Sequence, residues 1–91
     1  MTDIANTLIE RGRRYGVFKG HAAITQNLKM MMTASPGWVR LSPSQKEALE
    51  MVAHKIGRIL NGDPDYDDSW LDIAGYAKLI ADELQSRDAG A

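Results

Sequence analysis

The clearest indication of the fold is the segment SPSQKEALEMVAHKIGRILNG, residues 42–62, because it carries signals for both ends of a helix and an apolar stripe between them. Ser42 is a preferred N-cap residue, Pro43 suits the first helical position, and Gln45 completes a capping box. Gly62 is placed to end the helix. The apolar residues recur at spacings of three and four: Leu49, Val52, Ala53, Ile56, Ile59 and Leu60.

These signals predict a core helix over residues 43–61, and the pattern resumes after an acidic loop. Ser69, followed three residues later by Asp72, resembles the opening of a second capping box. We therefore predict another long helix over 69–86. Its stripe contains small residues that let a partner helix come close: Trp70, Ile73, Ala74, Ala77, Ile80, Ala81 and Leu84. The two helices are expected to form a central antiparallel hairpin.

The first half of the chain is expected to hold two shorter helices, over residues 3–11 and about 21–33. Between them, residues 11–20 contain three glycines and four basic residues, a composition typical of turns, and we predict a basic loop there. The complete fold class is all-α, a small four-helix domain over residues 1–91. We expect residues 1–2 and 87–91 to fray, because neither end has an apolar period.

Length and composition favour a homo-oligomer. A chain of 91 residues buries only roughly 60–65% of its unfolded surface on folding. It has no cysteine, so disulfides and thiolate zinc sites cannot supplement the small core. The N-terminus lacks the apolar run of a secretory signal, and no segment approaches the length of a membrane span. We expect a protein of the cytoplasm with no membrane partner.

Charge is distributed unevenly along the chain. The net charge is −1, made of +3 in residues 1–32, +2 in 33–62 and −6 in 63–91. This polarity suits steering of an anion toward the first half, attraction of a metal to the second, or pairing of subunits. A general nucleic-acid binder is more basic, and the loop between the two long helices is too long for a helix-turn-helix. We therefore do not expect nucleic acid as a partner.

The predicted hairpin brings basic and acidic side chains together. An antiparallel arrangement places the second half of the core helix beside the start of the last helix. The residues that meet are His54, Lys55 and Arg58 with Asp68, Asp72 and Tyr76, and Trp70 lies near them at the start of the last helix. Two interpretations are open. The group lines a ligand pocket, or Lys55 or Arg58 forms a structural ion pair with Asp72.

The basic loop adds a second candidate for ligand contact. Arg14 supplies a guanidinium group that suits phosphate, and Tyr15 supplies a ring that suits base stacking. Both are requirements of a nucleotide site. The alternative is that Tyr15 and Phe18 anchor the loop to the core and leave the arginines free.

A metal is possible but not required. Glu47 and Glu50, three residues apart, present two carboxylates to one point and are candidate ligands for Mg²⁺. Asp63, Asp65 and Asp67 imitate the opening of a calcium loop, but the glycine and the closing glutamate of that loop are missing. The sequence also lacks a Walker loop, a zinc-ligand array and a nucleophile-base-acid pattern. We assign no catalytic residue.

Three motifs carry a family resemblance: RGRRYGVF at 11–18, AHKIGRILNGDP at 53–64 and DSWLDIAGYA at 68–77. The chain resembles small phage and prophage proteins with an uncharacterised all-helical domain, and more distantly phage domains linked to nucleotide metabolism. Lys55, Arg58, Asp72 and Tyr76 match the latter. A comparison with MazG-like nucleotide pyrophosphohydrolases rests on Glu47-x-x-Glu50. Those enzymes hold magnesium with four helix-borne acids, whereas here the second pair would come from Asp65 and Asp68 on the loop, or from Asp72 alone.

Together these observations predict a phage-derived, homo-oligomeric protein that binds a nucleotide-type phosphorylated ligand, in the cytoplasm of the bacterial host. Binding would serve magnesium-dependent pyrophosphate hydrolysis or sequestration of a nucleotide signal. The competing hypothesis is a protein-interaction module without a small ligand, which uses the methionine run at 30–32 or the acidic C-terminal half.

Overall fold

A computed structural model describes the backbone of residues 2–90 and the side chains of 3–87. Within these bounds the chain is all-α, as predicted, with no strand. The elements are α1 (Thr2–Tyr15), α2 (Phe18–Ala34), a 3₁₀ turn η1 (Pro36–Arg40), α3 (Pro43–Asn61) and α4 (Asp67–Gly90). Of the ends predicted to fray, Met1 and Ala91 lie outside the described residues, whereas the backbone is helical at Thr2 and from 87 to 90.

α3 has the predicted bounds because its capping signals form as the sequence indicates. The Gln45 backbone N–H donates to Ser42 Oγ at 3.1 Å, and the Ser42 N–H donates to Gln45 Oε1 at 2.8 Å. At the other end the Gly62 N–H donates to the Arg58 carbonyl at 3.1 Å. Both ends of α3 are therefore fixed by local chemistry.

α4 begins earlier than predicted. The helix starts at Asp67, so Ser69 lies inside the first turn, buried at 3% exposure, and does not act as the N-cap. Asp67 and Asp68 occupy that first turn, where negative charge interacts favourably with the helix dipole.

The basic loop is the main error in the predicted fold. α1 continues through Gly12 to Tyr15, and α2 already begins at Phe18, so only Gly16 and Val17 connect them. A glycine inside a helix costs only about 1 kcal/mol relative to alanine, and Glu10 offsets part of that cost by pairing with Arg13 and Arg14 along the helix. The chain turns at Gly16 instead, whose φ of +78° is a conformation that favours glycine.

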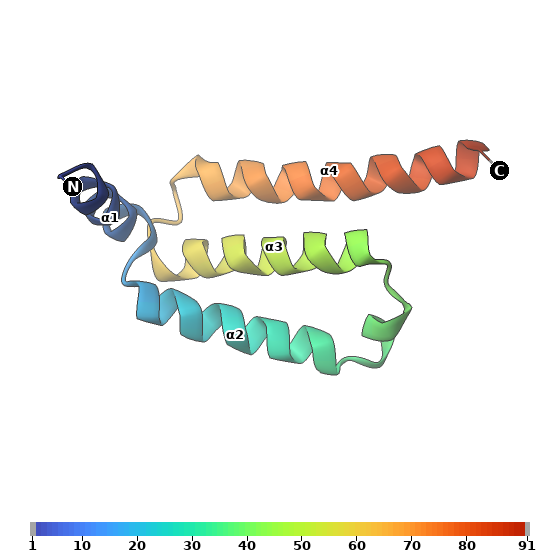
Figure 1. Ribbon diagram of the computed structural model, residues 1–91, viewed down its shortest axis with the longest axis horizontal. Coiled ribbons are helices and arrows are strands. Elements are labelled where there is room, and N and C mark those ends of the chain that lie inside the picture. Colours follow the sequence, from blue (N-terminus) through green and yellow to red (C-terminus); the bar gives the residue numbers. More distant parts are fainter. Residues whose placement is uncertain (1, 91) are drawn as a thin grey trace.

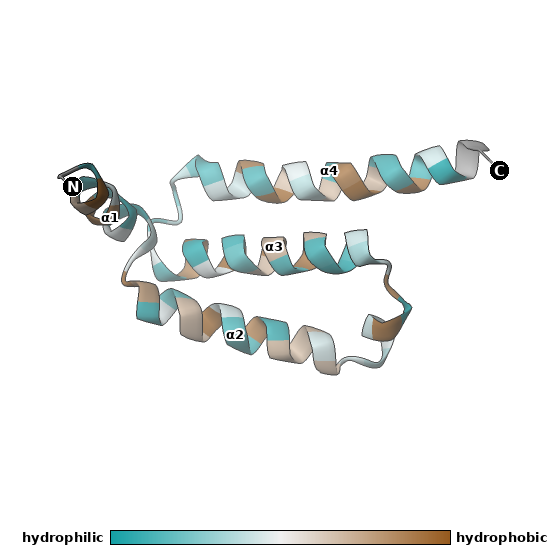
Figure 2. Ribbon diagram, viewed as in Figure 1, coloured by the Kyte–Doolittle hydropathy of each residue, from teal (hydrophilic) through white to brown (hydrophobic). Residues whose placement is uncertain are grey.

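The three longer helices lie side by side. α2 and α4 flank α3 on opposite sides, each antiparallel to it, and α1 is seen nearly end-on beside the N-terminal ends of α2 and α4 (Figure 1). The predicted hairpin of α3 and α4 is therefore confirmed. Polar residues colour much of the visible side of α3 (Figure 2). We call this arrangement of α2, α3 and α4 the three-helix layer.

The layer has little interior. Among the described residues, the only apolar side chains that are buried belong to Ala48 and Ala53. Several large apolar side chains stay exposed, including Met31 at 72% and Leu60 at 67%. Within the described chain, no helix combines the length and the apolar character needed to cross a membrane.

Candidate functional site

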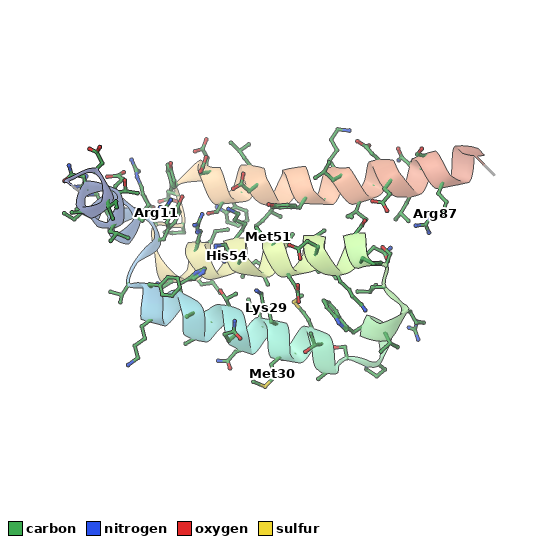
Figure 3. All side chains as sticks on the ribbon, viewed as in Figure 1. Arg11, Lys29, Met30, Met51, His54 and Arg87 are labelled. Atoms are coloured by element: carbon green, nitrogen blue, oxygen red, sulfur yellow. The ribbon has the colours of Figure 1, made fainter. Side chains whose placement is uncertain are left out.

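The largest group of predicted ligand-binding residues meets at a pocket between α1 and the start of α2, against the last turns of α3. The pocket has a volume of about 500 Å³, which lies within the range of small-molecule sites. Of the predicted residues, Tyr15, His54 and Arg58 line it. The remaining lining residues are Leu8, Arg11, Gly12, Gly16, Val17, Phe18 and His21. Figure 3 labels Arg11 and His54 at this end of the molecule.

Asn61 holds the short connection that forms one edge of the pocket. Its side-chain amide donates to the carbonyls of Tyr15 at 2.9 Å and Val17 at 2.8 Å. The residue that ends α3 thus fixes where α1 stops and α2 starts. The Asp63 N–H also donates to the Arg14 carbonyl at 2.8 Å, so the loop after α3 is hydrogen-bonded to the end of α1.

Two arginines stack on two tyrosines beside this connection. The Arg58 guanidinium carbon lies 4.1 Å from the centre of the Tyr15 ring, and that of Arg14 lies 4.4 Å from the Tyr66 ring. Arg14 also donates to Glu10 at 2.9 Å, and this bond raises its pKa. Arg14 is therefore engaged next to the pocket, whereas Arg58 lines it.

A histidine pair forms the polar floor of the pocket. His21 Nε2 and His54 Nδ1 are 3.3 Å apart, and the rings meet edge-on with centres 4.6 Å apart. Thr25 Oγ1 lies 3.4 Å from the same His21 nitrogen. In the neutral state one imidazole donates its N–H and the other accepts, and the tautomer decides which.

The pocket favours neutral histidines and an anionic ligand. Burial, followed by the positive charge of Arg58, lowers the pKa of His54 to about 4. Burial also lowers the pKa of His21, and Arg58 adds to that effect. No acidic residue lines the pocket, and within the described residues neither Arg11 nor Arg58 forms an ion pair with a carboxylate. Two cations thus face a cavity without local neutralisation.

Lys55 and Asp72 meet each other as the hairpin requires, but away from the pocket. Lys55 Nζ lies 2.9 Å from Asp72 Oδ2, with the Lys55 side chain 11% exposed and Asp72 43% exposed. Neither residue lines the pocket. Of the two interpretations drawn from the sequence, the structural ion pair describes this contact.

Trp70 and Tyr76 are placed apart from the pocket as well. The Trp70 indole N–H donates to the Pro64 carbonyl at 2.9 Å, so it braces the acidic loop against α4. Tyr76 lines an apolar groove between α3 and α4 with Leu49 and Ile80. The eight predicted ligand-binding residues therefore separate into three at the pocket, Arg14 beside it and four elsewhere.

Glu47 and Glu50 lie on α3, away from the pocket. Glu47 lines a shallow groove near the start of α3 that Tyr76 and Glu83 also line. In the described part of the chain, no three histidine, cysteine or acidic side chains come together to hold an ion. Glu50 does not line this groove, so the structure adds nothing to the sequence-based suggestion that these two carboxylates bind Mg²⁺.

Arg11, Phe18 and His21 line the pocket but were not among the predicted site residues. The signal for Arg11 was present in the sequence, because Leu8, Arg11 and Tyr15 share one face if the first helix is continued past Gly12. His21 gave no such signal. Its contact with His54 joins residues 33 positions apart and depends on how α2 packs on α3.

Fold and pocket define a small all-α domain with a cationic, ring-lined cavity at one end of a three-helix layer. The chain belongs to the family described as a domain of unknown function, DUF6378, which matches residues 2–84. Comparisons with curated proteins and with solved structures found no match.

Proposed function

We propose that this protein binds a nucleotide-type phosphorylated small molecule in the pocket between α1, α2 and α3. The observation that carries the proposal is the pairing of two uncompensated arginines, Arg11 and Arg58, with the Tyr15 and Phe18 rings around one cavity. Guanidinium groups bind phosphate oxygens through two parallel N–H donors, and aromatic rings accept a stacked base. One cavity thus offers both halves of nucleotide recognition.

Arg58 is prepared for this role by its stacking on Tyr15. The stacked face fixes the plane of the guanidinium, while the N–H donors at its edge stay available for an anion. Phe18 is 76% exposed, which leaves its ring free to cover a ligand. In the neutral histidine pair, His21 Nε2 and His54 Nδ1 bond to each other and His21 Nδ1 is buried, which leaves His54 Nε2 as the ring nitrogen available to a ligand.

The biological setting of the proposal follows from the family resemblance. A phage or prophage protein in the cytoplasm of a bacterial host would use this pocket in nucleotide metabolism or to sequester a nucleotide signal. Hydrolysis of a pyrophosphate bond would require Mg²⁺ on Glu47 and Glu50, supplemented by the phosphates of the ligand. Because these carboxylates do not line the pocket, binding without hydrolysis is the form of the proposal that we favour.

Calorimetric titration of the purified protein with nucleoside mono-, di-, tri- and cyclic phosphates tests this function. We expect at least one class to bind, and Arg58→Ala to weaken it by about tenfold or more, because a charge-assisted hydrogen bond contributes about 1.5–3 kcal/mol. Arg87→Ala is the matched control, since Arg87 is exposed in the last turn of α4. No binding at millimolar ligand, with or without Mg²⁺, would exclude both the metabolic and the sequestering role.

A protein-interaction module is the second candidate, and the exposed apolar side chains of α1 and α2 favour it. Ile4, Leu8 and Ile9 are each more than 60% exposed, and so are Met30 and Met31. Such side chains suit an adaptable contact with a host or phage protein. An affinity capture that yields one stoichiometric partner, retained by an Arg14→Ala, Arg58→Ala variant, would support this candidate over ligand binding.

A further inference from the structure

α3 presents two opposite faces that are not covered by α2 or α4. Successive residues of an α-helix are rotated by about 100°, so Leu49, Ile56 and Leu60 share one face while His54 and Arg58 point about 180° away from it. The second pair lines the ligand pocket. The first face is apolar, with Leu49 44% exposed and Leu60 67% exposed. We call it the apolar face of the layer.

The neighbouring helices extend this apolar face on both sides. On α4, Ile73 and Ala77 line a groove of about 420 Å³ together with Leu49 of α3. On α2, Leu28 and Met31 follow at helical spacing on the flank of the helix that continues the same face, and Met31 is 72% exposed. Three parallel rows of apolar side chains therefore lie on one side of the layer, opposite the pocket.

The size of this face fits one more copy of the chain. Three helices packed 8–10 Å apart are about 28 Å wide, and the 19 residues of α3 are about 28 Å long, which gives roughly 800 Å². A stable interface of standard size buries about that area on each partner. A second identical layer is apolar over the same outline and supplies the interior that the single chain lacks.

The charges of the outer helices select one arrangement of the two layers. α2 contains two basic residues and no acidic one, whereas α4 contains six acidic and two basic residues. A two-fold axis that lies in the interface and runs perpendicular to the helices would place α4 against α4 of the other chain. Two acidic helices would then repel each other. An axis parallel to the helices places the basic α2 of one chain over the acidic α4 of the other, and both helices begin at the same end of the layer (Figure 1).

We propose that a second copy of the chain covers the apolar face in a two-fold dimer, with α3 parallel to its copy and α2 over the partner's α4. Each residue along the centre of α3 then faces the same residue of the other chain. The pocket stays open on the far side of each layer. The proposal is thus independent of ligand binding.

The molar mass of the full chain, measured by sedimentation velocity or light scattering, tests whether the apolar face of the layer forms the dimer interface. We expect a wild-type mass of about 20 kDa, twice that of the 10.1 kDa chain, and a monomer for Leu60→Asp. Leu71→Asp is the matched control, because Leu71 is 62% exposed on the side of α4 turned away from α3. Far-UV circular dichroism confirms that both variants remain helical. A monomeric wild-type chain, or a Leu60→Asp variant that keeps the wild-type mass, overturns the proposal.

Introduced cysteines test the orientation, since the chain has none of its own. In the proposed dimer, Leu60→Cys forms a covalent dimer with itself when treated with a short bis-maleimide. With a perpendicular axis through the middle of α3, Leu60 would face Gln45 of the other chain, and crosslinking would require a mixture of the Leu60→Cys and Gln45→Cys chains. Crosslinking only in the mixture therefore contradicts the parallel arrangement. Leu71→Cys, on the outer edge, is expected to stay uncrosslinked.

Discussion

Gly57 lies where side chains of α2 pack directly against the backbone of α3. A Cβ atom at this position would collide with Thr25 Oγ1 and lie 3.0 Å from His21 Nδ1. Both contacts come from buried side chains that are held in place, Thr25 by its branched Cβ and His21 by its partner His54. The glycine therefore allows the histidine pair to form.

Gly57→Ala is expected to destabilise the protein by about 1–3 kcal/mol, because overpacking exceeds the gain in helix propensity. Gly75→Ala is the matched control. It lies inside α4 with no atom within 4 Å of the added methyl group, so the same substitution is expected to stabilise by up to about 1 kcal/mol. Urea unfolding measures both. Equal effects of the two substitutions would contradict the close approach at Gly57.

The histidine pair predicts a dependence of stability on pH. The folded-state pKa of His54, about 4, lies below its ordinary value of 6.5. Between these two pH values His54 is protonated in the unfolded chain and neutral in the folded chain. Stability is full above pH 6.5 and falls as the pH drops toward 4. His21, Lys29, Lys55 and Arg58 all face His54 as positive or protonatable groups, and all act in the same direction.

We expect a loss of about 1 kcal/mol between pH 7 and pH 4.5 from this source, less than the full shift would give, because His54 is partly exposed and solvent screens its charge. His54→Gln keeps a polar side chain and removes the titration, so its stability should vary less across the same window. Thermal unfolding of both proteins at a series of pH values checks this. Identical profiles of stability against pH for the two proteins would show that His54 does not cause the loss of stability at low pH.

At the scale of elements, Asn61 couples the end of α3 to the connection between α1 and α2. Two hydrogen bonds from one amide hold the carbonyls on either side of Gly16. α1 otherwise exposes its apolar stripe and meets the layer only through its last turns, since Leu8 and Ile9 are each 62% exposed. Together with the hydrogen bond from the Asp63 N–H to the Arg14 carbonyl, this side chain holds α1, and with it one wall of the pocket, in position.

Asn61→Ala is expected to cost about 1–3 kcal/mol through the two lost hydrogen bonds, and to loosen α1 more than α3 or α4. Hydrogen exchange followed by mass spectrometry measures the loosening by segment. Asn27→Ala, on an exposed position of α2, is the control and should leave the exchange of α1 unchanged. A uniform rise in exchange across all helices would show that Asn61 acts on global stability alone.

At the scale of the whole molecule, the layer has two faces with different chemistry. One carries the pocket, with Arg11, Arg58 and the histidine pair, and the other carries the apolar rows of α2, α3 and α4. α1 stands at one end, where it walls the pocket. In the proposed dimer the apolar faces meet and the two pockets open outward, so ligand capture and association use separate surfaces.

Elements whose signals are local could be predicted from the sequence. Both bounds of α3 follow from the capping box at Ser42 and from Gly62, and the antiparallel hairpin follows from two matching apolar stripes. The ion pair of Lys55 with Asp72 was likewise one of the two expected outcomes, because pairing of the two helices in register brings these side chains together.

Which candidate residues share a site could not be predicted from the sequence, because it depends on contacts between helices. The contacts of Asn61 with Tyr15 and of His21 with His54 span 46 and 33 positions. In each pair the two residues lie on different helices, and the apolar pattern of a helix does not show how it is placed relative to the others. Local signals also failed at the basic loop, where composition alone suggested a turn and the pairing of Glu10 with Arg14 continued the helix. Side-chain chemistry can be listed from a sequence, but which groups meet depends on how the helices pack.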